Sequence, residues 1–431
     1  MVEKKHSDKL ENNKGDRLTF KSVYLLLFFV IILGGVLVNN FSGLFKNKPE
    51  LFKDENDISN GVSSHQIESR LDNKIIDMIP DIFIYDKLRE GVFLGVKGDL
   101  KDIYAYDINN NSLKKIIRVK DEGNFIKSLS CNSDWIVWVE NEVLIMDTSN
   151  KPFKWQIVAQ NILTGEQIVI DKSPFSSNKF EVPMHIDYTP NKVSISNEDV
   201  VVYCRNDFRG AKIISELICY DIKSKERKVI AQTSDVIKEL IMECNIYGDN
   251  IVWSRFRELN DDYEYRFTRY KYSDLYIYNI KTDKTEQLTK DDFYHDAYIF
   301  EDKVVAIYVP PNKPNQTAYN SEVVLMNLND KKFNTVVHED SPCYRRKEDE
   351  MVRCSPKIDS KYISWSNSGG FSNRFIYDYK NNKFIEIYDG TEDTHDNTIV
   401  MYDRFSNYAL FYIAGTDGDI KKFCVIINDI K

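Results

Sequence analysis

Seven short motifs divide most of this chain into repeats of similar length. In each motif an apolar run of alternating pattern ends in Asp or Asn, and in all but the last copy an apolar residue and a polar turn follow. The seven marker residues are Asp107, Asn161, Asp221, Asn279, Asn327, Asp378 and Asn428. Subtraction gives spacings of 54, 60, 58, 48, 51 and 50 residues. A period near 50 residues made of strands and turns is typical of a β-propeller, in which each repeat forms one small sheet, or blade.

The repeat around Asn279 shows the internal pattern. Residues 250–254 and 274–280 are rich in β-branched and aromatic side chains, a polar turn follows at 281–284, and residues 285–289 form another strand-length run. Such runs bounded by turn residues predict strands joined in hairpins. A β-sandwich is the alternative all-β architecture. The number of repeats favours a propeller of seven blades, with six as the second possibility.

These repeats resemble those of the TolB-type propeller family, whose blades read as an apolar strand, a Trp, a loop and then a strand ending in a turn. The stretches that carry the resemblance are residues 251–289 and 155–170, and the resemblance covers roughly residues 80–430. It implies a propeller fold and does not define a site. The namesake of the family has an α/β domain before its propeller, for which residues 46–79 are too few.

The segment before the repeats predicts a membrane anchor. Residues 22–45 contain no charged side chain, and about 20 apolar residues in a helix can cross a bilayer. Residues 1–21 hold six Lys or Arg against four acidic residues, so the positive-inside rule places them in the cytoplasm as an N-terminal tail. A cleaved signal peptide is the alternative, but a small-residue cleavage site is not evident. We therefore expect a single-pass membrane protein with an extracytoplasmic linker at 46–79 and a propeller at 80–431.

The last repeat lacks a strand that the others have. It contains strand-like runs near 398–403, 407–414 and 421–428, and the given sequence then ends. An open edge of this kind invites aggregation, so we expect residues 73–79 to supply the missing fourth strand and close the ring.

Composition excludes some classes of partner and reaction. The formal net charge is −9, and an acidic chain lacks the basic footprint of a nucleic-acid-binding protein. The sequence contains no G-x-S-x-G elbow, phosphate-binding glycine loop or H-E-x-x-H motif. We expect no catalytic residues and no obligatory cofactor.

The cysteines do not form a recognisable framework. Seven cysteines occur without a C-x-x-C pair, which argues against a zinc ribbon. Cys343 and Cys354 flank a charged segment between two repeats, and an extracytoplasmic location permits a disulfide between them. The other five read as small buried side chains.

The long segments between strands suggest where a partner binds. By propeller topology, segments 141–154, 206–214, 257–272 and 310–320 within blades and 172–180, 338–350 and 390–396 between blades fall on one face. Long loops on a rigid scaffold commonly carry binding sites. Segment 257–272 interleaves aromatic and charged residues, and its candidate binding residues are Tyr263, Tyr265, Arg266, Arg269 and Tyr270.

Three histidine–aspartate pairs are a candidate metal site. Each precedes a predicted innermost strand, so the pairs could meet at the mouth of the central channel. The residues are His185 with Asp187, His295 with Asp296, and His395 with Asp396. The alternative is that all three lie in unrelated surface loops.

We therefore predict a non-enzymatic, membrane-anchored binding or scaffold module that presents its long-loop face to a protein or a cell-envelope glycan. The alternative is a propeller enzyme that acts on a carbohydrate or a small ester, with a metal at the channel mouth.

Overall fold

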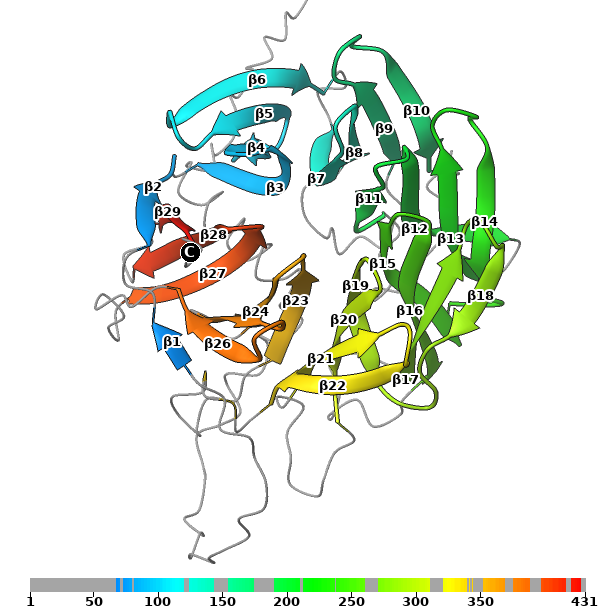
Figure 1. The fold of residues 1–431 in the computed structure, drawn as a ribbon. Helices are drawn as coiled ribbons and strands as arrows, with labels where there is room; N and C mark the ends of the chain where they lie inside the picture. The colour runs from blue at the N-terminus through cyan, green and yellow to red at the C-terminus, as the bar shows by residue number, and fades with distance from the viewer. Residues whose placement is uncertain are drawn as a thin grey trace, which may run out of the picture.

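The computed structural model describes residues 67–69, 73–79, 81–119, 124–142, 154–173, 190–209, 212–236, 238–259, 270–310, 321–338, 341, 343, 352–368, 375–387, 397–415 and 420–427. Over these residues the chain forms strands and turns and no helix. The strands make seven sheets arranged around a centre (Figure 1), as expected for a seven-bladed propeller. The all-β class and the number of blades predicted from the repeats are confirmed.

Each blade is a meander of antiparallel strands, numbered outward from the channel. Blades 1 to 3 consist of β3 (Ile82–Arg89), β4 (Val92–Lys97), β5 (Asp102–Asp107) and β6 (Ser112–Arg118); β7 (Phe125–Cys131), β8 (Trp135–Asn141), β9 (Trp155–Asn161) and β10 (Gln167–Lys172); and β11 (Val193–Ile195), β12 (Val200–Arg209), β13 (Lys212–Asp221) and β14 (Arg227–Gln232). Blades 4 and 5 consist of β15 (Glu239–Tyr247), β16 (Asn250–Leu259), β17 (Tyr270–Asn279) and β18 (Lys284–Gln287); and β19 (Tyr294–Phe300), β20 (Lys303–Tyr308), β21 (Glu322–Asn327) and β22 (Lys332–Val337). Blade 6 contains β23 (Val352–Ile358), β24 (Tyr362–Ser368), β25 (Phe375–Asp378) and β26 (Lys383–Glu386), and blade 7 contains β27 (Asn397–Phe405), β28 (Tyr408–Gly415) and β29 (Ile420–Ile426).

The repeated Asp or Asn has a clear structural role. In blades 1 to 6 it ends the third strand, and its side-chain oxygen accepts hydrogen bonds from backbone N–H groups of the following turn. Asp107 Oδ1, for example, accepts from Asn109 and Asn110 at 3.0 and 3.2 Å. Four residues after each described marker, the chain adopts positive φ, at Asn111, Gly165, Lys225, Asp283, Lys331 and Asn382. A turn closed by a residue in this region is a common hairpin connection, which explains why the marker recurs once per blade.

Apolar side chains fill the space between neighbouring blades. Seven buried clusters lie at the interfaces of the ring: one lies between blades 1 and 2, one between each following pair, and one between blades 7 and 1. The cluster between blades 5 and 6 also extends to residues of blades 3 and 4. The largest fully buried side chains include Trp138 and Trp253, which the repeat pattern marks in the second strand of blades 2 and 4. Each sheet is therefore covered on both faces only when it has two neighbours.

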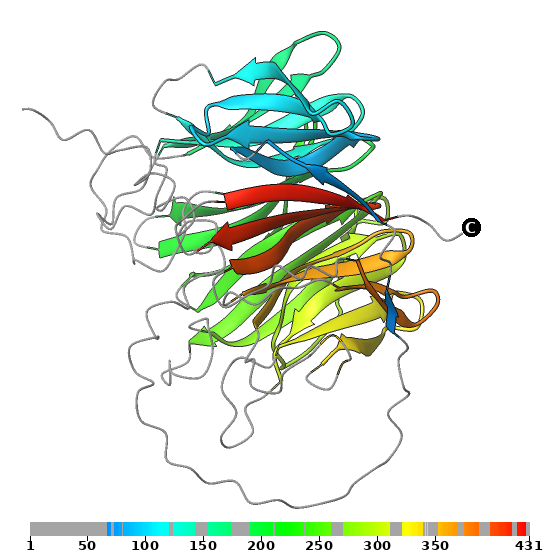
Figure 2. The ribbon, with the colours of Figure 1, turned by 90° about the vertical axis from the view of Figure 1, so that its left-hand side faces the viewer.

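The N-terminal part of the described chain closes the ring. Strand β2 (Lys74–Asp77) pairs antiparallel with β29 as the fourth strand of blade 7, which confirms the prediction for residues 73–79. Lys422 reinforces this seam, since its carbonyl accepts the Met78 N–H at 2.9 Å and its Nζ donates to the Ile82 carbonyl at 2.6 Å. A second N-terminal strand, β1 (Ile67–Ser69), was not anticipated. It adds to β26 in parallel as a fifth strand of blade 6 and is seen as a short blue arrow beside orange strands in Figure 2.

Two of the predicted loops are largely strand. Strands β12 and β13 stay paired as far as Arg209 and Lys212, so the expected loop at 206–214 is the tip of a long hairpin. Strands β16 and β17 likewise stay paired as far as Leu259 and Tyr270. These segments alternate polar and apolar residues, a period of two that predicts strands. Their high charge had suggested loops instead. Most residues of the other predicted long loops lie outside the described residues.

The predicted anchor at 22–45 also lies outside the described residues. In the part of the chain that the structure does describe, no helix has the length and apolar character needed to cross a membrane.

Removal of the closing strand should destabilise the ring. The comparison is between a chain that begins at Asn73 and a chain that begins at Asp81, since both keep blade 1 complete. The second chain lacks β2 and the buried Met78, and it should melt at a lower temperature because blade 7 then exposes an unpaired edge and part of its core. Circular dichroism during heating measures the difference. Equal melting temperatures would refute closure by β2.

Candidate functional site

β-Bulges recur in the inner strands that line the channel. Six of the seven described inner strands contain a β-bulge, where pairing to the second strand shifts register. In three consecutive blades the bulge holds a residue with positive φ: Glu243 at 60°, Asp296 at 55° and Ser355 at 50°. The Asp296 N–H donates to Glu243 Oε2 at 2.6 Å, and the Ser355 N–H donates to Asp296 Oδ2. We call these three residues the bulge chain, because they link blades 4, 5 and 6 by hydrogen bonds.

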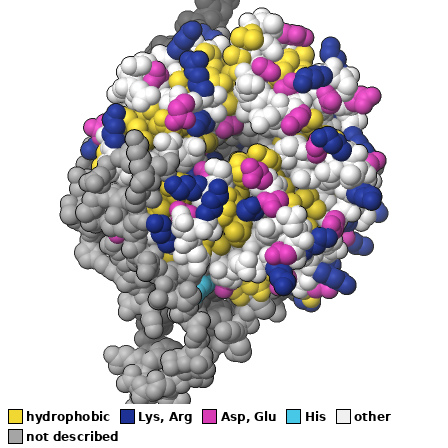
Figure 3. Space-filling model, in the orientation of Figure 1, with side chains coloured by type: hydrophobic (Ala, Val, Ile, Leu, Met, Phe, Trp, Pro, Cys, Tyr) yellow, Lys and Arg dark blue, Asp and Glu magenta, His cyan; other side chains and the backbone are white. Residues whose placement is uncertain are grey.

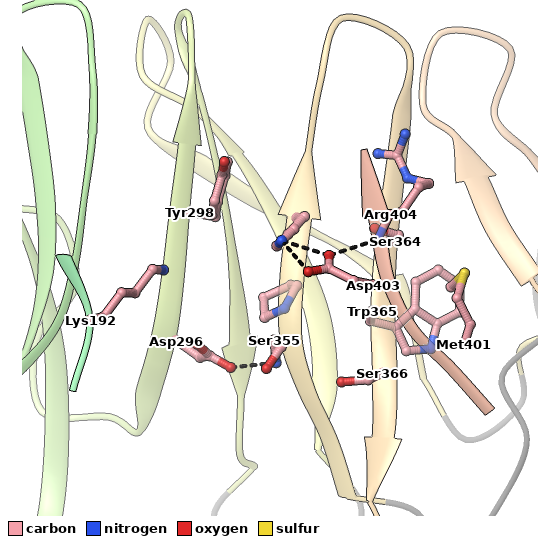
Figure 4. A pocket seen from close by; sticks show the side chains of 12 residues that line it. Lys192, Asp296, Tyr298, Ser355, Ser364, Trp365, Ser366, Met401, Asp403 and Arg404 are labelled. Atoms are coloured by element: carbon pink, nitrogen blue, oxygen red, sulfur yellow. Dashed lines mark hydrogen bonds and ion pairs between the residues drawn. The ribbon is translucent and has the colours of Figure 1, made fainter. Parts of the chain in front are cut away.

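A cavity of about 240 Å³ lies beside the bulge chain. It is lined by residues from the inner strands β19, β23 and β27, by the second strand β24, and by Lys192, which immediately precedes β11. Figure 4 shows Lys192, Asp296 and Tyr298 on one side and Asp403 and Arg404 on the other. The cavity therefore draws on blades 3, 5, 6 and 7, and it exists only in the assembled ring. We refer to it as the channel cavity.

An ion pair crosses from blade 6 to blade 7 in this cavity. Lys357 Nζ lies 2.6 Å from Asp403 Oδ1 and 2.8 Å from Oδ2, and 4.4 Å from the centre of the Phe405 ring. Burial disfavours the lysine charge, but Asp403, together with Tyr298 and Asp86, more than offsets burial and raises the pKa of Lys357. Lys357 is therefore charged at neutral pH, and Asp403 already engages it before any ligand binds.

Arg404 has a structural role at the wall of the cavity. It is buried, with Nη1 at 2.6 Å from Asp359 Oδ2 and Nη2 donating to the Tyr362 carbonyl at 2.9 Å. These partners belong to the first hairpin of blade 6, so Arg404 ties blade 7 to blade 6. Asp86 has a comparable role between blades 1 and 2, since it accepts hydrogen bonds from the Ser130 hydroxyl and the Cys131 N–H at 3.0 and 2.9 Å. Burial raises the pKa of Asp86, although these hydrogen bonds oppose the shift.

Lys192 and Tyr298 are the groups of the cavity with capacity for a ligand. Lys192 Nζ lies 5.4 Å from the centre of the Tyr298 ring, and within the described chain it makes no ion pair with an acidic residue. The Tyr298 hydroxyl likewise has no hydrogen-bond partner among the described residues, and burial raises the pKa of this tyrosine. Lys192 and Tyr298 therefore lie on the same side of the cavity, and Trp365 lies on the opposite side (Figure 4).

Glu243 is the acidic group whose protonation is most altered. Burial, together with the nearby carboxylate of Asp296, raises the pKa of Glu243 to about 8. A shift of this size is common at functional sites and also occurs in buried structural networks. In this case the bulge chain gives Glu243 a structural task as well, because its carboxyl accepts the Asp296 N–H.

The predicted metal residues do not form a metal site within the described chain. His295 lies in β19, is buried and packs edge-on against Phe293 at 5.9 Å, while burial lowers its pKa to about 4. Asp296 belongs to the bulge chain instead. The remaining members of the set, His185, Asp187, His395 and Asp396, lie outside the described residues. No group of three or more His, Cys, Asp or Glu side chains suited to a metal occurs among the residues that are described.

The predicted binding hairpin is described only at its base. Tyr263, Tyr265, Arg266 and Arg269 lie outside the described residues. Tyr270 is 3% exposed, packs against Phe256 and Phe293, and donates its hydroxyl hydrogen to the Val236 carbonyl. Its proposed role in binding is therefore wrong, because its position in an alternating strand points it into the core.

The disulfide predicted between Cys343 and Cys354 remains a prediction. Cys343 is partly buried against the cluster between blades 5 and 6. Cys354 lies in β23, and its side chain is outside the described part of the structure.

Comparison with known proteins yields structural neighbours only. The sequence matches no protein-family profile, and no curated protein is significantly similar. Oligogalacturonate lyase in complex with manganese is 12% identical over 81% of this chain and 77% of its own, with a TM-score of 0.43. TolB from Acinetobacter baumannii is 14% identical over 80% of this chain and 63% of its own (TM-score 0.36), and the β-propeller domain of the Trilobed protease from Pyrococcus furiosus is 10% identical over 70% and 93% (TM-score 0.38). At these identities and TM-scores the likeness carries nothing about function.

Sequence reasoning did not identify Lys192, Tyr298, Lys357 or Asp403. Each occupies an inner strand or its start, where polar residues in an otherwise apolar run were a usable signal. The inner strand of a propeller faces the channel with one side, so polar residues at matching positions of several repeats indicate a shared lining. That comparison requires alignment of the inner strands, whose bulges displace the register.

Changing Glu243 to Gln should alter the pH dependence of stability. Since folding raises the pKa of Glu243 from 4.5 to about 8, the folded state binds the proton more tightly, and stability falls as the pH rises between these values. The Gln side chain of Glu243→Gln cannot lose a proton, so the melting temperature of this variant should fall less than that of the wild type between pH 5 and pH 8.5. The two decreases should differ by about 2 °C or more.

Thermal melting across this pH range, with Glu166→Gln in an exposed turn as control, measures the effect. Parallel curves for wild type and Glu243→Gln would show that Glu243 titrates normally.

Proposed function

We propose that this protein is a non-enzymatic binding module, anchored in the membrane by residues 22–45, with its propeller outside the cytoplasm. Its ligand is a cell-envelope glycan, and a polar group of that glycan enters the channel cavity. The observation that supports this most strongly is the juxtaposition of Lys192 and Tyr298 in a cavity shared by four blades. A protein surface is the alternative ligand for the same binding module.

The size and lining of the cavity favour a small polar group. Its volume of about 240 Å³ lies just below the roughly 300–1,000 Å³ usual for small-molecule sites, so it suits one unit of a longer chain. Ser364 and Ser366 contribute to the lining, and the ring of Tyr298 adds an aromatic surface. Hydroxyl and ammonium donors beside aromatic rings satisfy the alternating polar and apolar faces of a sugar.

The distribution of charge on the surface of the ring favours a ligand recognised by specific contacts over a ligand attracted by a large charge of one sign. In Figure 3 Lys or Arg and Asp or Glu side chains are intermixed over the visible described face, without a large area of one sign. The proposed partners therefore exclude nucleic acid, which demands a basic footprint. In this proposal Tyr263, Tyr265, Arg266 and Arg269 extend the contact beyond the cavity.

Glu243 supports the alternative function, a propeller enzyme that acts on a carbohydrate or a small ester. A carboxyl group with a pKa of about 8 is protonated at neutral pH and has the property required of a general acid. Metal analysis of the purified protein tests the metal-dependent form of this alternative. Stoichiometric zinc or calcium would favour the enzyme over the binding module.

Loss of the Lys192 charge should weaken glycan binding. Lys192→Met keeps most of the side-chain volume and removes the charged donor, and a hydrogen bond to a charged group contributes about 1.5–3 kcal/mol, so the Kd should rise at least tenfold. Titration calorimetry of the detergent-solubilised full-length protein with soluble envelope-glycan fragments measures this. Lys281→Met, an exposed lysine paired with Asp249, is the control and should bind as the wild type does. Equal affinity of all three proteins would contradict binding at the cavity.

The proposed topology predicts that the propeller is accessible from outside the cell. Protease added to intact, wall-stripped cells should remove the propeller, while a salt wash should not release it. Immunoblotting with antibodies against the propeller detects both results. Complete protection from protease until the cells are lysed would place the propeller in the cytoplasm.

A further inference from the structure

The cations of the channel cavity differ in whether a carboxylate neutralises them. Three cationic side chains line the cavity, namely Lys192, Lys357 and Arg404. Lys357 pairs with Asp403, and Arg404 pairs with Asp359, at 2.6 Å in each case. Lys192 Nζ, in contrast, has no carboxylate oxygen within 4.0 Å among the residues that the structure describes. The charge of Lys192 is therefore the one in this lining that is left for a ligand to balance.

The acidic side chains of the bulge chain leave this charge in place. The carboxylate of Asp296 accepts the Ser355 N–H, and Figure 4 shows it turned toward Ser355 and not toward Lys192. Glu243 is attracted by Lys192, but burial and the carboxylate of Asp296 still raise the pKa of Glu243 to about 8. Glu243 is therefore mostly protonated at neutral pH and cannot serve as the counter-ion of the lysine.

The ammonium group of Lys192 is placed to meet a ligand. Lys192 Nζ lies 5.4 Å from the centre of the Tyr298 ring, and Figure 4 shows the side chain reaching into the cavity at a level between Tyr298 and Asp296. A neutral sugar seated there would remove water from the ammonium group without supplying an opposite charge, which is unfavourable. A carboxylate or a phosphate would supply both the charge and the acceptor oxygens, and charge-assisted hydrogen bonds of this kind are the stronger ones.

We propose that the ligand group that enters the channel cavity is an anion, the carboxylate or phosphate ester of an acidic glycan, and that Lys192 selects it over a neutral sugar. This inference rests on the proposed function, because it specifies the charge of the glycan group in the same cavity. Carboxylate and phosphate present the same chemistry to a lysine, namely negatively charged oxygen atoms. The volume of about 240 Å³ is suited to one charged unit of such a chain.

Paired probes that differ in charge test the proposal. An oligosaccharide of uronic acids is compared with the same oligosaccharide after reduction of its carboxyl groups to alcohols, and an oligomer of glycerol phosphate is compared with an uncharged oligomer of glycerol. Titration calorimetry of the detergent-solubilised full-length protein measures each Kd. We expect an anionic probe to bind about tenfold or more tightly than its neutral counterpart, as a hydrogen bond to a charged group allows.

Variants of Lys192 separate its charge from its volume. Lys192→Met should bind the anionic and neutral probes with nearly equal affinity, whereas Lys192→Arg keeps the charge and should keep most of the preference. Lys281→Met is the control, because Lys281 is exposed and pairs with Asp249 at 2.6 Å, and it should behave as the wild type does. Labelling of amines followed by peptide mapping gives a second readout. The anionic probe should protect Lys192 from the reagent and leave Lys281 as reactive as before.

The outcomes distinguish this inference from the proposed function. A preference for the carboxylate or for the phosphate probe that is lost in Lys192→Met supports the inference and identifies the source of the anion. Equal binding of charged and neutral probes to the wild type would overturn the selection of an anion while glycan binding stands. A preference that persists in Lys192→Met would overturn the role of Lys192. Failure of every probe to bind would overturn the inference together with the proposed glycan function.

Discussion

Closure of the ring between blade 7 and blade 1 is the constraint on which the rest of the structure depends. A propeller blade buries both faces only between two neighbours, and the seventh apolar interface exists because β2 returns to pair with β29. Loss of that interface would expose two sheets and an unpaired strand edge at once. The closed ring also places Lys192 of blade 3 and Asp403 of blade 7 at the wall of the same channel cavity. Stability and the candidate site therefore share one cause.

The bulge chain shows how the inner strands are held at a common radius. Three residues other than glycine adopt positive φ in consecutive blades, a conformation that costs of order 1 kcal/mol or more each. The cost is offset by hydrogen bonds from the N–H of one bulge to the carboxyl group of the preceding one. Because Glu243 and Asp296 are neighbours as well as acceptors, one of them holds its proton more tightly. The raised pKa of Glu243 thus follows from the same arrangement that aligns the blades.

Much of the fold was predictable from the sequence, whereas the site was not. The marker residues Asp107 to Asp378 cap a turn in each of blades 1 to 6, and a local signal of this kind survives without an alignment. The need for a closing strand also followed from counting strands in the last repeat. The bulges carry no sequence signature, so the facing of Lys192, Tyr298 and Lys357 into one cavity could not be foreseen. Tyr270 was misassigned because charged neighbours concealed its place in an alternating strand.

The central claim is that the channel cavity, built by inner strands from several blades, receives a polar group of the ligand. Hydrogen–deuterium exchange of the full-length protein, with and without soluble fragments of the cell-envelope glycan, tests it most directly. We expect slower exchange in Tyr294–Phe300 and Val352–Ile358, the inner strands that carry Asp296, Tyr298 and Lys357. Protection confined to outer strands such as Gln167–Lys172 or Arg227–Gln232, with β19 and β23 unchanged at saturating ligand, would contradict it.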